Sequence, residues 1–145
     1  MNDPHIYRRS VYMERINEIE RMLLGLAEQT RLRILNILKD GEASVSTITV
    51  SLGLAQPKVS RHLAYLRESG VAMARRDGKQ IYYRLADHLR SSSIVMAVVR
   101  ELDGVEVHGQ DVLAEDRQRF DHLPAQTFAQ PHMSNKTEEM ETYLL

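Results

Sequence analysis

Basic and polar side chains are concentrated in one stretch of this chain. Residues 56–85 contain seven Lys or Arg residues and only two Asp or Glu residues. Ammonium and guanidinium groups bind phosphate oxygens, and Arg, Gln and Ser side chains also hydrogen-bond the edges of bases. The stretch therefore predicts a surface that binds duplex DNA. The candidate contact residues are Gln56, Lys58, Ser60, Arg61, His62, Arg75, Arg76 and Lys79.

An amphipathic helix would position the first five of these residues. Val59, Leu63 and Leu66 recur at helical spacing, which predicts a helix over residues 57–69 with one buried face. The opposite face would be able to enter a major groove. For His62, which lies beside the apolar stripe, contact with the DNA backbone and a hydrogen-bonded packing role both remain open.

A β-hairpin would position the other three candidate contact residues, Arg75, Arg76 and Lys79. Asp77-Gly78 separates two alternating runs, which is a strong signal for a hairpin with strands at residues 72–76 and 79–85. The three cations flank its tip. Because such a cluster at a turn has little structural purpose, we expect it to contact phosphates.

The remaining apolar periodicity predicts four further helices. They are expected at residues 10–26, 30–39, 46–52 and 87–102, with Ala27 facing the core beside the second helix and Ser46 capping the third. The last helix is densely apolar, and it has more apolar surface than a peripheral helix of a small monomer can hide.

Length and composition predict one domain with two tails. The chain has 145 residues, 43% of them hydrophobic, and a formal net charge of −1. We expect a flexible arm at residues 1–9, a folded domain at 10–104, and a mostly disordered acidic extension at 105–145 with a short helix at 112–120. Residues 101–145 contain ten acidic and three basic residues, so this extension conceals the basic stretch in the overall charge.

Several functional classes are excluded or disfavoured. The chain has no cysteine, which excludes disulfides and thiolate metal sites. It has no apolar run long enough for a membrane span and no apolar signal core near its start, so we expect a cytoplasmic protein. No nucleophile with a base, no Gly-rich phosphate loop and no close carboxylate pair is apparent, so we expect no enzyme.

Three strings of residues together resemble the ArsR/SmtB family of small winged helix-turn-helix repressors. They are residues 26–35, 56–63 and 70–85, and the resemblance covers about residues 15–102. It implies a mainly α fold with a small β-hairpin, in the order ααααββα. It also implies a homodimer that binds an inverted-repeat operator and leaves it when a ligand binds. The inducer, the operator and the regulated genes remain open.

The resemblance also implies dimer pairing through the first and last helices. The expected interface residues are Tyr12, Ile16, Ile19, Leu23, Val95, Val98, Val99 and Leu102. Ala55 stands where the family usually has a hydroxyl-bearing cap before the recognition helix.

The positions that hold metals in the family's sensors are altered here. The thiolate pair would fall at Ser44 and Ser46, and the last-helix site would fall at Asp87, Leu89, Arg100 and Asp103. Hydroxyls do not replace thiolates for soft ions, and both imidazoles of the second site are missing. We therefore predict no metal at either place and no cofactor. A site built from His88, His108, Asp111 and His122, with Asp87 or Glu106, remains an alternative.

The function predicted from these residues is a dimeric, sequence-specific transcriptional regulator, most simply a repressor. The alternative is a winged-helix protein-interaction module whose basic face binds an acidic partner, because a fold alone does not assign a function.

Overall fold

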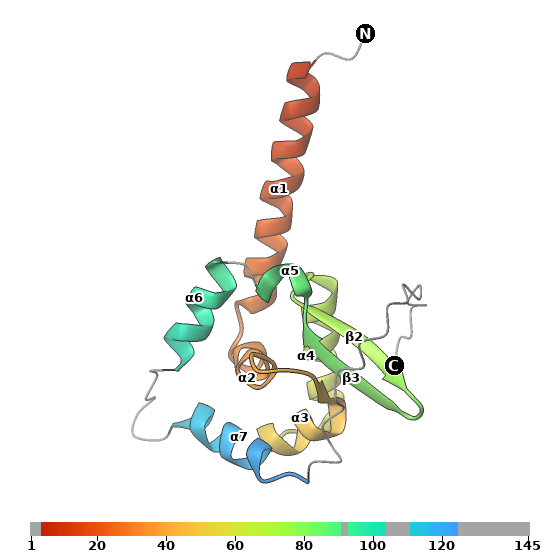
Figure 1. Cartoon of the computed structure of the whole chain (residues 1–145), viewed down its shortest axis with the longest axis vertical. Coiled ribbons are helices and arrows are strands. Elements are labelled where there is room, and N and C mark those ends of the chain that lie inside the picture. Colours follow the sequence, from red (N-terminus) through yellow and green to blue (C-terminus); the bar gives the residue numbers. More distant parts are fainter. Residues whose placement is uncertain (1–3, 91–92, 104–110, 125–145) are drawn as a thin grey trace.

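The computed structural model describes residues 4–90, 93–103 and 111–124 (Figure 1). In chain order the elements are α1 (Pro4–Leu26), α2 (Gln29–Leu38), β1 (Ala43–Ser44), α3 (Val45–Leu52), α4 (Gln56–Glu68), β2 (Ala72–Asp77), β3 (Gln80–Leu85), α5 (Asp87–Arg90), α6 (Ser93–Leu102) and α7 (Val112–Asp121). The predicted fold class, mainly helical with a small β-hairpin, is confirmed.

The core lies around α2, which the other elements surround (Figure 1). Ile34, Leu35 and Leu38 of α2 are fully buried, as predicted. So is the predicted stripe of α4, formed by Val59, Leu63 and Leu66. The prediction for Ala27 was wrong, because Ala27 lies in the short connection between α1 and α2 and is exposed.

Helices α3 and α4 form a pair joined by a tight turn. α3 begins one residue after Ser44, whose hydroxyl accepts a hydrogen bond from the Thr47 backbone N–H at 3.0 Å, so the predicted cap at Ser46 was two residues too late. α3 ends at Gly53, which adopts the left-handed conformation with φ of 62°. Ala55 then starts α4 without any side-chain hydrogen bond to its backbone.

The sheet has three antiparallel strands in the order β1-β3-β2. The predicted hairpin is present, but Asp77 pairs with Gln80, so the turn consists of Gly78 and Lys79 and is shifted by one residue. Gly78 supplies the positive φ of 59° that the turn requires. The sequence did not reveal β1, because a strand of two residues carries no readable alternation.

Helix α1 projects from the rest of the chain (Figure 1). Met22 and Leu26 near its end are buried, whereas residues 8–18 are exposed. The helix starts at Pro4, so residues 4–9 are helical and the predicted flexible arm was wrong for them. Proline is well suited to a first helical position because its missing N–H would have no partner there. Residues 1–3 lie outside the described residues.

The predicted helix at 87–102 is two helices, α5 and α6. The described part of this segment is helical at residues 87–90 and again at residues 93–102. Residues 91–92 lie outside the described residues.

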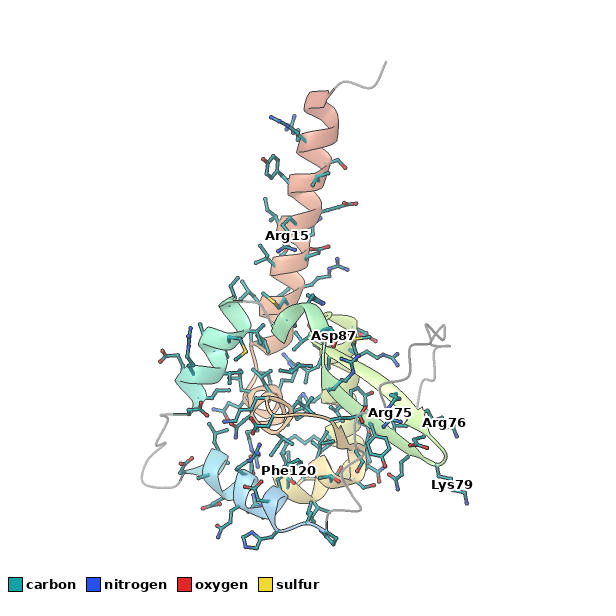
Figure 2. All side chains as sticks on the ribbon, viewed as in Figure 1. Arg15, Arg75, Arg76, Lys79, Asp87 and Phe120 are labelled. Atoms are coloured by element: carbon teal, nitrogen blue, oxygen red, sulfur yellow. The ribbon has the colours of Figure 1, made fainter. Side chains whose placement is uncertain are left out.

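Helix α7 packs against α2 and α3. Phe120, which is labelled in Figure 2, and Asp116 are its buried residues. The predicted short helix is confirmed. The predicted domain boundary at 104 was wrong, because this helix belongs to the folded domain; the rest of the predicted disordered extension, residues 105–110 and 125–145, lies outside the described residues. In the part of the chain that is described, every helix is too short or too polar to cross a lipid bilayer.

Candidate nucleic-acid interface

The polar face of α4 presents the first group of predicted contact residues. Gln56, Lys58 and Arg61 are exposed, and Ser60 is half-buried among them. These residues occupy the first two turns, while the opposite side of the helix is anchored in the core. The structure therefore brings four predicted residues together on a rigid helix that follows a tight turn.

The far end of the β2–β3 hairpin presents two further cations. Arg76 and Lys79 are exposed and lie near the tip, away from the core (Figure 2). The Arg76 guanidinium donates a hydrogen bond to the Gly78 carbonyl oxygen at 3.0 Å, which holds it close to the turn.

Arg75 differs from its two neighbours. Its guanidinium donates two hydrogen bonds to the Glu42 carboxylate, at 3.0 and 2.8 Å, and a third to Asp77 at 3.2 Å. It also lies over the Tyr82 ring, 4.8 Å from the centroid. The hydrogen bonds to Glu42 raise the pKa of Arg75 further above its ordinary value, although partial burial opposes them. This predicted DNA contact is thus already bound by two carboxylates.

His62 lies on the inner side of α4. Its side chain is 16% exposed, and Nδ1 lies 3.4 Å from Oε2 of Glu28. Burial lowers the pKa of His62; the charge of Glu28 raises it, but the cations Arg31, Lys58 and Arg61 lower it further. The pKa of the imidazole therefore lies below its ordinary value. Of the two roles left open by the sequence, this geometry favours packing.

Glu28 and Arg31 were missed by the sequence reasoning. Glu28 caps α2 by accepting a hydrogen bond from the Arg31 backbone N–H at 3.0 Å. Burial opposes ionisation of this carboxyl, but hydrogen bonds from Thr30 and Arg31 outweigh it and lower its pKa. The Arg31 guanidinium lies 4.3 Å from the centroid of the Tyr65 ring and donates to the Gly25 carbonyl. Glutamate is not among the preferred capping residues, so its sequence position gave little signal.

The comparisons with known proteins bear on this arrangement. The model for the ArsR family of bacterial regulatory proteins matches residues 28–73. An arsenic resistance transcriptional regulator of Pseudomonas putida is 54% identical over 61 residues, which are 41% of this chain and 48% of that protein. The biofilm growth-associated repressor of Xylella fastidiosa is 39% identical over 84 residues, which are 58% of this chain and 73% of that protein. The chain belongs to the ArsR family.

A solved structure agrees with this assignment. The homodimeric winged helix-turn-helix DNA-binding domain from Mycobacterium bovis superposes with a TM-score of 0.54 at 30% identity, covering 70% of this chain and 94% of that one. In ArsR-family terms α3 and α4 are the helix-turn-helix and the β2–β3 hairpin is the wing. Because its relatives are transcriptional regulators and repressors, this ArsR-family chain is a transcriptional regulator and not an enzyme.

Four of the six positions at which the resemblance would place metal ligands have other structural roles here. Ser44 caps α3, Leu89 is buried, and Asp87 and Asp103 pair with Arg84 and Lys39.

Two residues of the alternative histidine site have other partners in the structure. Asp111 caps α7, and His122 bonds to the Gln118 carbonyl oxygen at 2.6 Å. Among the described residues no three His, Asp or Glu side chains are grouped as a metal ion would need. His108 and Glu106 lie outside the described residues.

The predicted dimer-interface residues fall into two groups. Tyr12, Ile16 and Leu23 of α1 are exposed, and Ile19 is half-buried. On α6 the four expected interface residues are partly or fully covered by the chain's own core. Val95 and Val99 are buried, and Val98 and Leu102 pack against the core, whereas the exposed apolar side chains of α6 are Ile94 and Met96.

A buried ion network fastens α7 to the helix-turn-helix. The Asp116 carboxylate is 0% exposed and accepts hydrogen bonds from Arg33 at 2.7 and 2.8 Å and from Arg119 at 2.8 Å. The bond to Asp116 raises the pKa of Arg33, despite opposing burial. The same two guanidiniums donate to the Leu52 and Ser51 carbonyl oxygens, at 2.7 and 2.6 Å, so both cap the C-terminal end of α3.

Proposed function

We propose that this chain acts as a homodimeric transcriptional repressor that binds an inverted repeat in duplex DNA. The observation that carries the proposal is the exposed face of α4, where Gln56, Lys58 and Arg61 lie opposite the buried stripe of a helix-turn-helix. In this proposal α4 enters the major groove, and its side chains contact base edges and phosphates. Arg76 and Lys79 on the wing contact phosphates beside it.

A second copy of the chain covers the exposed apolar face of α1. Tyr12, Ile16 and Leu23 are too apolar to remain together in water on a projecting helix. Ile94 and Met96 on α6 extend the same kind of surface. The related domain from Mycobacterium bovis is homodimeric, which supports this pairing. A twofold dimer would place its two α4 helices in successive major grooves, roughly 34 Å apart.

Release from DNA would follow when a ligand binds one dimer geometry better than another. Such coupling is typically about 1 to 3 kcal/mol. The positions of the family's known metal ligands supply neither thiolate nor imidazole here, so the proposal assigns no ligand to them.

Selection from a pool of random duplexes, followed by sequencing, tests the proposal. We expect an enriched inverted repeat whose half-sites are centred about 10 base pairs apart. Fluorescence anisotropy on that duplex should show affinity that falls steeply with salt. Lys58→Ala with Arg61→Ala should abolish selective binding, whereas Arg15→Ala, at an exposed site on α1, should not. Failure to enrich any repeat, or affinity that ignores salt, would reject the proposal.

A further inference from the structure

We infer that Arg75 is a positioning residue that fixes the direction of the wing, with Glu42 as its partner, and that Arg75 does not itself bind phosphate. The inference rests on the proposed DNA binding. Neither Arg75 nor Glu42 lies on the recognition face of α4. Glu42 was not among the residues predicted from the sequence.

The contact between Arg75 and Glu42 crosses the whole sheet. Arg75 on β2 pairs with Tyr82 on β3, and Tyr82 pairs with Ser44 on β1. The guanidinium passes over the Tyr82 ring and reaches Glu42, just before β1, through two parallel hydrogen bonds. One side chain thereby connects the two outer strands across the middle one.

Burial and charge make this contact hard to exchange for a phosphate. The Glu42 side chain is only 9% exposed, so water competes little for its oxygens. If Arg75 turned toward DNA, it would leave a nearly buried carboxylate unpaired, which is costly. Asp77 occupies a third N–H of the same guanidinium, so two carboxylates surround one cation. Little positive potential remains at Arg75 to attract a phosphate.

The partner of Arg75 lies at the start of the helix-turn-helix. Glu42 precedes β1, and β1 continues directly into α3 through the capping residue Ser44. The ion pair therefore ties the wing to the same segment that orients α3 and α4. A protein that grips DNA with both α4 and the wing tip needs the angle between them to be fixed, and a bidentate pair restricts that angle more than a single hydrogen bond does.

Replacement of Glu42 distinguishes a positioning role for Arg75 from direct phosphate binding by Arg75, because the two roles predict opposite changes in DNA affinity. Glu42→Gln removes a negative charge near the DNA. If Arg75 binds phosphate, the freed guanidinium should tighten binding. If Arg75 positions the wing, the variant should bind about ten-fold more weakly, as expected for the loss of a charged hydrogen-bonded pair. Glu68→Gln, at an exposed acidic residue that ends α4, is the matched control for removing one negative charge.

The experiment is fluorescence anisotropy with a labelled duplex of about 30 base pairs that carries the inverted repeat enriched from the random pool, long enough for both half-sites. Affinities are measured at a temperature where circular dichroism shows each variant folded, so a loss of stability alone would not change them. We expect Glu42→Gln and Arg75→Gln to weaken binding equally, and the double variant to be no weaker than either. Glu68→Gln should bind as tightly as the unaltered protein or slightly more tightly.

The outcomes distinguish the inference from the proposed function. If the unaltered protein does not bind the duplex, the proposed function fails and the inference falls with it. If the unaltered protein binds and Glu42→Gln binds as tightly or more tightly, only the inference is overturned. Additive losses in the double variant would also overturn it, because they would mean that the two residues act separately.

Discussion

Gly25 in α1 lies against Ser69 at the end of α4, so closely that a β-carbon on Gly25 would stand 2.6 Å from the β-carbon of Ser69. Real β-carbons essentially never approach other atoms within 3.0 Å. The glycine is therefore required by contact between two helices. Through it, the helix proposed to pair the subunits touches the helix proposed to enter DNA.

Gly25→Ala is expected to destabilise the fold. Alanine should favour the helix by about 1 kcal/mol, but overpacking against Ser69 should cost about 1 to 3 kcal/mol. Urea unfolding would measure the difference. In a Ser69→Gly background the same substitution should cost much less, and an equal loss in both backgrounds would contradict the close contact.

Asp116→Asn should lower the free energy of unfolding by about 3 kcal/mol, because it leaves two guanidiniums without their buried carboxylate. Glu115→Gln is the control, since Glu115 is exposed and lies 3.9 Å from Arg119. Thermal or denaturant unfolding would compare them. Equal losses in the free energy of unfolding for the two substitutions would show that the buried network stabilises the fold no more than an exposed ion pair does.

Ala55→Ser should stabilise the domain by about 1 kcal/mol. Ala55 is the capping residue of α4 and makes no side-chain hydrogen bond. A serine hydroxyl there would accept a hydrogen bond from the Lys58 N–H, which now donates only to the Ala55 carbonyl oxygen at 3.0 Å. The melting temperature should rise for serine and not for Ala55→Val, which supplies no acceptor. An unchanged melting temperature for serine would argue against this cap.

Ile16→Glu should convert the proposed dimer into monomers, because it places a charge in the apolar face of α1. Sedimentation velocity would detect the change in mass. Arg15→Ala, one residue away and also exposed, should remain dimeric. If the Ile16→Glu variant remains dimeric, the subunits must contact each other through a surface other than the apolar face of α1.

The stability of the protein should fall as the pH is lowered from about 7.5 to 5.5, near the ordinary histidine pKa. Burial lowers the pKa of His62, so the folded state binds fewer protons than the unfolded state in this range. Stability is therefore full above the ordinary pKa and is lost as the pH drops through the lowered one. His62→Gln should show a shallower fall in urea midpoints; an identical slope would mean that His62 titrates normally.

Local patterns in the sequence were sufficient for much of the fold. The stripe of Val59, Leu63 and Leu66 predicted α4, its buried face and hence its exposed face, because these depend on neighbours within two turns. Pairings between distant residues could not be predicted in this way. Arg75 was expected to contact DNA because its partner, Glu42, lies 33 positions earlier and no periodicity connects them.

Helix α7 is a second case in which a contact between distant residues could not be predicted from the sequence. Residues 112–120 were expected to be helical, but nothing local indicated that Asp116 would be buried beneath Arg33, 83 positions away. The acidic composition of the segment instead suggested a solvated extension, because a paired carboxylate and a solvated one look identical in a sequence.

The 83 positions between Arg33 and Asp116 affect how the protein folds during its synthesis. Synthesis proceeds from the N-terminus, so Arg33 leaves the ribosome long before Asp116 has been added to the chain. Until then its guanidinium remains hydrated and the end of α3 lacks the Arg119 cap. The two guanidinium caps at the end of α3 are therefore complete only after α7 has been synthesised, and we expect a chain that ends before α7 to bind DNA more weakly.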